Sequence, residues 1–267
     1  MSELGVIVAG CAGRMGRAVM RAVQESDGVR LAGGFDRSDC GEKGVDLGRL
    51  IGVDDLGLTV ADTVAPYGAG DVVIDFTAPA ASISTASRAA EAGVALVLGT
   101  TGFSAEDEVE IGRQAETIPI VKSGNMSLGV NLLAALVEKA ASALDEGFDI
   151  EVLEMHHRHK VDAPSGTALL LGEAAAHGRA VNLSEKSVRT RDGITGARKP
   201  GDIGFATLRG GGVVGEHEVL FASDQEVVRL SHQALDRSLF AKGAVAAAKW
   251  AVGKPPGLYT MRDVLSL

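Results

Sequence analysis

The chain has 267 residues, of which 46% are hydrophobic and 23% are charged, as is typical of a globular protein with one large or two medium domains. The formal net charge of −9 argues against non-specific nucleic-acid binding. No stretch approaches the roughly 20 apolar residues that cross a bilayer, and the first residues carry no basic region. Only two cysteines occur, Cys11 and Cys40. We therefore expect a protein of the reducing cytoplasm that binds neither nucleic acid nor membrane.

Strands and helices alternate through the first half of the chain. Apolar runs predict strands over 4–9, 29–35, 71–76, 94–98 and 118–121. Helical periodicity and capping residues predict helices over 17–25, 80–92 and 104–116. This alternation predicts an α/β fold with a doubly wound parallel sheet, as in Rossmann-like domains.

The pattern changes after residue 127. A helix is predicted over 128–144, a strand over 148–155 and a helix over 167–176, and the polar segment 177–202 is expected to be a loop. Strands follow over 203–208, 213–222 and 226–231 with no helix between them, so we expect a mixed or antiparallel sheet in a second, α+β domain. The predicted domains are therefore 1–127, to which a helix over 237–252 returns with the rest of 237–267, and 128–236.

A glycine-spaced turn, Gly10–Gly16, separates the first predicted strand from the first helix. Backbone N–H groups in such a turn, with the partial positive charge of the helix N-terminus, bind phosphate. The spacing departs from G-x-G-x-x-G because Ala12 stands at the second glycine position. Asp36 ends the next strand 20 residues after Gly16, where a carboxylate accepts hydrogen bonds from an adenosine ribose. The alternative is that the turn is rich in glycine only because it packs closely, and that it binds no nucleotide.

Arg37 follows Asp36 directly. A carboxylate repels the 2′-phosphate of NADP, whereas an arginine holds it, so the pair is compatible with both NADH and NADPH. A solvated surface arginine is an equally good interpretation of Arg37. Two polar loops, Gly99–Gly102 and Ser123–Met126, follow the fourth and fifth strands. Ligands of open α/β sheets bind beyond such strand ends, so these loops are candidates to line the nicotinamide and its ribose, although each alone is typical of an ordinary loop.

The segment 154–167 concentrates three histidines, two fixed cations and a helix start. Histidine donates protons near neutral pH, and Lys160 can hold a carboxylate or donate a proton itself. Ser165 is a candidate helix cap, and the hydroxyls of Ser165 and Thr167 with the N–H groups of the first turn form a carboxylate site. The cluster therefore predicts reduction of an unsaturated dianion. Arg158 and His159 are equally well explained as solvated side chains, and no metal-ligand spacing joins the cluster.

Two other functions fit the same features. One is an NAD(P)-dependent dehydrogenase that acts on an amino acid or a sugar, because such enzymes share this architecture. A noncatalytic nucleotide sensor shares the glycine turn but has no use for the histidine–lysine cluster, which counts against it.

The segment Glu154–Thr167 reads E-x-H-H-x-x-K-x-D-A-P-S-G-T and resembles the signature of the 4-hydroxy-tetrahydrodipicolinate reductase (dihydrodipicolinate reductase) family of lysine biosynthesis. The resemblance runs along nearly the whole chain. It is supported by the segments 8–17, 75–77, 99–103, 203–206, 214–217 and 257–265.

The resemblance implies an oxidoreductase of the diaminopimelate pathway that uses NADH or NADPH to reduce a cyclic imine dicarboxylate. Hydride goes to C4 after loss of the 4-hydroxyl, and a proton goes to C3. It also implies a homotetramer in which the second domains bind substrate and build the central interface.

Residue roles follow from the same resemblance. His156 is similar to the family's catalytic acid or base, and Lys160 to its proton donor, which also contacts substrate. The implied substrate-binding residues are His157, Lys160, Ser165, Gly166, Thr167 and Arg237, the last at the second carboxylate. The implied cofactor contacts are Gly10, Cys11, Ala12, Gly13, Arg14, Met15, Asp36, Arg37, Gly99, Thr100, Thr101, Ser123, Gly124, Asn125 and Met126. Met126 stands where several relatives carry an aromatic residue.

Overall fold

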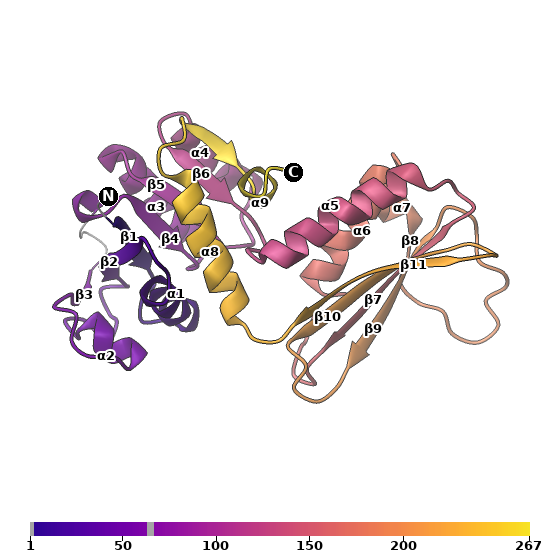
Figure 1. Ribbon diagram of the computed structural model, residues 1–267, viewed down its shortest axis with the longest axis horizontal. Coiled ribbons are helices and arrows are strands. Elements are labelled where there is room, and N and C mark those ends of the chain that lie inside the picture. The colour runs from indigo at the N-terminus through magenta and orange to yellow at the C-terminus, as the bar shows by residue number, and fades with distance from the viewer. Residues whose placement is uncertain (1–2, 63–66) are drawn as a thin grey trace. The chain divides into compact units, whose positions relative to one another are not determined.

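The computed structural model describes residues 3–62 and 67–267, which form two compact units (Figure 1). The first unit comprises Met1–Leu128 and Ser238–Leu267, and the second comprises Gly129–Arg237. The chain thus leaves the first unit once and returns to it through the helix α8, Ser238–Ala251.

The first unit is built on a seven-stranded sheet with the order β12-β6-β5-β4-β1-β2-β3. Every adjacent pair in it is parallel. The strands are β1 Leu4–Ala9, β2 Val29–Phe35, β3 Val60–Ala61, β4 Val72–Asp75, β5 Ala95–Leu98, β6 Pro119–Lys122 and β12 Gly257–Tyr259. The predicted doubly wound parallel sheet is confirmed.

Alternate residues of the same strands enter two cores, one on each face of this sheet. Val6 and Val8 of β1 belong to one core, and Ile7 and Ala9 belong to the other. The helices α1, Arg14–Gln24, and α8 supply the first core, whereas α3, Pro79–Ala92, and α4, Ala105–Ala115, supply the second. Because both faces are covered, the strands are apolar along their whole length rather than alternating.

The second unit contains a five-stranded mixed sheet with the order β11-β10-β7-β9-β8. Its strands are β7 Asp149–His156, β8 Ser187–Val188, β9 Ile203–Arg209, β10 Gly215–Ala222 and β11 Val227–Ala234. β10 pairs antiparallel with both β7 and β11, whereas β7–β9 and β8–β9 are parallel. The helices α5, Leu128–Ala143, and α6, Gly166–Gly178, pack on one face of this sheet through a single core (Figure 1).

The structure corrects the sequence prediction at several short elements. The segment 177–202, expected as a loop, holds the helix α7, Leu183–Lys186, and the strand β8, because Asn182 caps the helix by accepting from the Ser184 N–H. α1 begins at Arg14 rather than at residue 17, directly after the glycine turn. Further elements absent from the prediction are α2 Leu47–Ile51, β3, the 3-10 helix η1 Tyr67–Ala69, β12 and α9 Met261–Val264.

Candidate active site

The glycine turn of the first unit joins the carboxyl end of β1 to α1. Gly10 has φ +64, a conformation that side chains disfavour, and a Cβ there would lie 2.8 Å from Thr77 Cγ2. A Cβ on Gly16 would lie 2.2 Å from the carbonyl oxygen of Gly10, so the helix packs directly on the turn. Gly13 is the N-cap residue and has no side chain that accepts from the first turn. The N-terminal N–H groups of α1 are therefore not capped by a side chain, as phosphate binding requires.

Asp36 lies beside this turn. Its Oδ2 accepts from the N–H of Ala12 at 3.0 Å, and its Oδ1 accepts from the N–H of Arg37 at 2.8 Å. Asp36 and Arg37 line a cavity of about 480 Å³ at the glycine turn. Other residues that line it are Gly10, Ala12, Gly13, Phe35, Cys40, Glu42, Tyr67, Phe76, Thr77, Arg88 and parts of α3. The cavity has the size of a small-molecule site and brings the predicted phosphate and ribose contacts together.

Arg37 is 80% exposed and forms an ion pair with Asp39, with Nε 3.3 Å from Oδ1. In the loop after β6, the Ser123 hydroxyl accepts from the Asn125 N–H, and the Asn125 side chain accepts from Ser127 N–H. Thr101 is exposed, and Gly99 has no room for a side chain because a Cβ would lie 2.1 Å from the Phe76 ring. Side-chain hydrogen bonds thus hold the turn after β6, and both loops lie at the strand ends where the sequence predicted cofactor contacts.

Three of the predicted cofactor residues have side chains that face inward. Cys11 and Met126 are 0% and 1% exposed and belong to the core on the α1 side. Burial, with a smaller effect of the Asp36 charge, raises the pKa of the Cys11 thiol to about 12. The Thr100 hydroxyl is buried and shares hydrogen bonds with Asp75 and Ser82. A cofactor contact of these residues is therefore expected through their main chain, and it stays a prediction.

In the second unit, His156 is the last residue of β7 and pairs with a buried carboxylate. Its Nδ1 lies 2.6 Å from Oε2 of Glu154, which is 1% exposed. Burial alone raises the pKa of Glu154, but Arg209, His156 and the Ser165 N–H outweigh it and leave this pKa lowered. Glu154 is thus an ionised acceptor and Nδ1 of His156 is the donor. The other ring nitrogen of His156, Nε2, faces Gly215, where an added Cβ would lie only 3.1 Å from it.

Ser165 joins this cluster to the start of α6. Its hydroxyl accepts from the Ala168 N–H, as the predicted cap requires, and lies 3.1 Å from Nε2 of His217. The His217 ring meets the His156 ring edge-on, with centroids 5.0 Å apart. Gly166 and Thr167 form the first turn of α6, directly after the cap.

The remaining predicted substrate residues lie in the same unit. Arg237 donates from Nη2 to Nε2 of His157 at 3.1 Å, so His157 is neutral and carries its proton on Nδ1. Burial and the Arg237 charge lower the pKa of His157, with smaller effects from His156, His159 and Lys160. Lys160 is paired with Asp162 at 2.8 Å. The structure therefore gathers the predicted acid and substrate residues into one cationic cluster, while Arg158 and His159 are exposed.

We expect the stability of the chain to depend on pH through His217. Burial, then the charge of His156, lowers its pKa from 6.5 to about 4. The unfolded chain therefore binds the proton first as the pH falls, so the stabilising contribution is present above pH 6.5 and is lost towards pH 4. The free energy of unfolding should fall by about 3 kcal/mol across that window. Denaturant titrations should show this slope weakened in His217→Gln. The exposed His177→Gln serves as control, and an equal slope in both variants would contradict the assignment.

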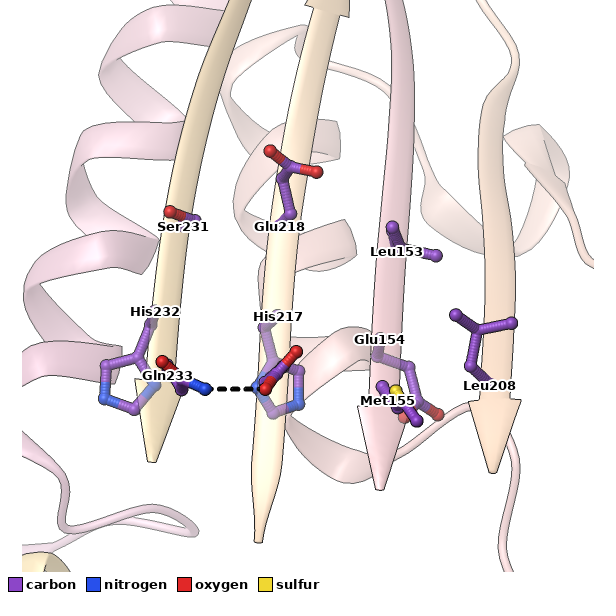
Figure 2. Close-up of a pocket in the computed structure, with 10 residues that line it drawn as sticks. Leu153, Glu154, Met155, Leu208, His217, Glu218, Ser231, His232 and Gln233 are labelled. Carbon is purple, nitrogen blue, oxygen red and sulfur yellow. Dashed lines mark hydrogen bonds between the residues drawn. The ribbon is translucent and has the colours of Figure 1, made fainter. Parts of the chain in front are cut away.

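A second cavity, of about 320 Å³, lies on the sheet of the second unit (Figure 2). Its lining includes Glu154, His217 and His232, which the strand register places side by side. Neighbouring residues of a strand point to opposite faces, so the side chains of the other lining residues lie on the opposite face of the sheet from these three. They are Leu153, Met155, Leu208, Glu216, Glu218, Ser231 and Gln233. Its lining lacks His156 and Lys160 but includes Glu154 and His217, both of which contact His156.

Sequence reasoning from residue types did not single out the partners of His156. Arg209 holds both oxygens of Glu154, and His217 contacts Ser165, but each lies more than 50 residues along the chain from the group it meets. Arg209 follows the quoted segment 203–206 closely, and His217 ends the quoted segment 214–217, so the family resemblance was the only signal that pointed to a function for this region.

Within residues 3–62 and 67–267, no group of three or more His, Cys, Asp or Glu side chains is arranged to hold a metal ion. The same residues contain no helix that is both long and apolar enough to span a bilayer.

A parallel sheet with a glycine turn under α1, joined in one chain to a unit with a histidine–lysine cluster, defines a nucleotide-dependent oxidoreductase. Family models described as "Dihydrodipicolinate reductase, N-terminus" and "Dihydrodipicolinate reductase, C-terminus" match residues 4–126 and 129–265. The chain belongs to the dihydrodipicolinate reductase family, as its sequence signature predicted.

Individual relatives agree with this assignment. The chain is 56% identical to 4-hydroxy-tetrahydrodipicolinate reductase 1 of Mesorhizobium japonicum, over 99% of this chain and 98% of the relative. It is also 56% identical to the corresponding reductase of Parvibaculum lavamentivorans, over 100% and 99% of the two chains.

Solved structures share the fold. Dihydrodipicolinate reductase from Paenisporosarcina sp. TG-14, solved with dipicolinate, superposes with a TM-score of 0.76 at 22% identity over 97% of both chains. An oxidoreductase from Agrobacterium radiobacter, solved with NAD+, gives a TM-score of 0.56 at 14% identity over 94% of this chain and 88% of that one.

Proposed function

We propose that this chain uses NADH or NADPH to reduce 4-hydroxy-tetrahydrodipicolinate to tetrahydrodipicolinate, in the diaminopimelate route to lysine. The observation that carries the proposal is the buried Glu154–His156 pair, set in a cluster with Lys160, His157 and Arg237 in the unit that matches the family's C-terminal model. A proton donor beside several cationic groups suits a dicarboxylate that must accept a proton.

The first unit offers a fitting site for the dinucleotide. Gly10–Met15 with the uncapped N-terminus of α1 would hold the pyrophosphate, and Asp36 would accept from the adenosine ribose. Arg37 stands at the same cavity, where it would face a 2′-phosphate. The loops Gly99–Thr101 and Ser123–Met126 would contact the nicotinamide end, the latter chiefly through its main chain. When bound, the reduced cofactor supplies the hydride.

The second unit supplies the proton and holds the carboxylates. His156 donates through Nε2, because Nδ1 is committed to Glu154. Lys160 contacts the substrate and donates a proton, and the neutral His157 binds it through Nδ1–H. Ser165, Gly166 and Thr167 hold one carboxylate at the first turn of α6, and Arg237 holds the other. Fixing both carboxylates orients the ring so that, after the 4-hydroxyl has left as water, hydride adds at C4 and a proton adds at C3.

The direct test supplies freshly generated cyclic imine and follows cofactor absorbance. Consumption of NADH or NADPH that depends on the imine supports the proposal. Oxidation of an amino acid or sugar without imine would favour a different dehydrogenase, and cofactor binding with no turnover would favour a nucleotide sensor.

We also propose that the chain acts in the cytoplasm as a homotetramer whose second units form the central interface. The face of the second sheet opposite α5 and α6 supports an interface, since Leu208 is 49% and Val227 48% exposed on it and no described helix covers it. Both cysteines are free, which is compatible with a reducing compartment.

Cofactor choice should depend on Asp36. Replacing it with Ser removes the ribose acceptor and the charge that repels a 2′-phosphate. We expect kcat/KM for NADH to fall about 10- to 100-fold, the value of a hydrogen bond to a charged group, while kcat/KM for NADPH is kept or raised. Steady-state kinetics with both cofactors measure the ratio. Asp54→Ser, which alters an exposed carboxylate of the same unit that does not line the cavity, is the control, and an unchanged ratio in Asp36→Ser would contradict the role.

A further inference from the structure

Glu154 is the most fully engaged carboxylate of the second unit. It is 1% exposed, and its two oxygens accept from three different parts of the chain. Oε2 accepts from His156 Nδ1 at 2.6 Å and from Arg209 Nη1 at 2.9 Å. Oε1 accepts from Arg209 Nη2 at 3.0 Å and from the Ser165 N–H at 3.0 Å. A buried carboxylate with this many donors holds them in one geometry.

We infer that Glu154 is a positioning residue for the reaction, which fixes the proton donor His156 and the carboxylate-binding turn at Ser165 to one another. This inference rests on the proposed roles of His156 and Ser165. Glu154 itself lies behind both residues and exchanges no proton with the substrate.

The imidazole of His156 is held at Nδ1 by the Glu154 carboxylate. A carboxylate at Nδ1 fixes the ring orientation and the tautomer, so that Nε2 is always the atom that faces the substrate. The negative charge also stabilises the protonated ring, which is the form that donates. Gly215 keeps the Nε2 side open, because a side chain there would begin 3.1 Å from that atom.

The start of α6 is held by the same carboxylate. Ser165 caps α6 with its hydroxyl, while its N–H is held by Glu154. The first turn of α6, which carries Gly166 and Thr167, is therefore anchored to the same carboxylate as the acid. Arg209 completes the arrangement, because it also donates to the main-chain oxygen of Asp162 at 2.7 Å and so fixes the loop after Lys160.

Several charged or titratable groups surround His156 and must be counted in any pH effect. Glu154 lies on the same strand, Arg209 on β9 and His217 on β10, and His157 and Lys160 lie in the following loop. Asp162 in the same loop is a second anion, but it is paired with Lys160, whereas Glu154 contacts the imidazole directly. Removing the charge of Glu154 therefore sets the sign of the effect on the imidazole.

The test compares the pH profile of kcat in Glu154→Gln and wild type. We expect kcat to fall about 10- to 100-fold, part of what a positioned proton donor contributes, with the Kd for NADH unchanged. The alkaline limb of the profile should move to lower pH, because the protonated donor has lost its anion. Glu154→Asp, which keeps the charge, should restore the position of that limb, at a reduced kcat.

Arg209→Gln provides a second measurement if Glu154→Gln does not fold. It removes a cation that competes for Glu154, so the alkaline limb should move to higher pH. The control is Glu151→Gln, a carboxylate on the same strand but the opposite face, held by Arg191 and Arg198, which should keep the wild-type profile.

Two results would overturn the inference. One is a folded Glu154→Gln with lowered thermal stability but a wild-type pH profile, which would make Glu154 a structural residue only. The other is a shift of Arg209→Gln in the same direction as Glu154→Gln. Absence of imine reduction in the wild type, by contrast, would contradict the proposed function itself, and with it the positioning role, before any variant is compared.

Discussion

His156→Ala is expected to lower kcat for imine reduction by about 10²–10⁴-fold, the contribution of a positioned general acid. Lys160→Ala should cause a loss of similar size and raise KM for the imine, because Lys160 is also proposed to contact the substrate. Neither change should alter the Kd for NADH, because both residues belong to the second unit and the dinucleotide cavity is lined by residues of the first. Steady-state kinetics and cofactor fluorescence titration measure the two effects separately.

His159→Ala is the matched control for both substitutions. It removes an imidazole from the same loop, next to Lys160, but from an exposed position. Its kcat should stay within about twofold of the wild type, as for most surface substitutions. Loss of NADH binding in His156→Ala with unaltered turnover of bound cofactor would show that the cluster serves the nucleotide, contrary to the proposed function.

Gly16→Ala should have the largest effect on the nucleotide site. Its Cβ would lie 2.2 Å from the Gly10 carbonyl oxygen and 2.7 Å from Cys11 Cα, both backbone atoms that cannot swing aside. α1 must then move away from the turn, at a loss of about 1–3 kcal/mol in the free energy of unfolding. Because the N–H groups that we propose bind phosphate move with the helix, kcat/KM for NADH should fall about 100-fold.

Gly112→Ala is the corresponding control. Gly112 lies within α4 of the same unit, and its Cβ would meet no atom within 4 Å. The substitution should stabilise the helix by up to about 1 kcal/mol and leave NADH kinetics unchanged. Denaturant titrations and initial-rate kinetics on both variants check the pair. A Gly16→Ala enzyme with wild-type NADH kinetics would contradict the role of the turn.

Much of the fold could be predicted because its signals are local. Buried parallel strands are continuous apolar runs, so β1 and β2 were predicted with the bounds that the structure has, Leu4–Ala9 and Val29–Phe35. The capping box of α4, formed by Ser104 and Asp107, is a similarly local device. Elements of two to five residues, such as α7 and β3, escaped prediction because they are too short for a periodic pattern, and depend on partners elsewhere in the chain.

The site divides in the same way. The sequence by itself determined the residue types that we propose carry the chemistry, since the glycine turn, Asp36, His156 and Lys160 each stand in a short segment whose spacing has a physical meaning. Only the tertiary structure decided which of their neighbours support them. Arg209 and His217 reach the cluster because β9 and β10 both pair with β7, and strand pairing is a long-range choice that no local pattern encodes. The tertiary structure also placed the side chains of Cys11 and Met126 in the core, because burial depends on what packs around a residue and not on its position in a motif.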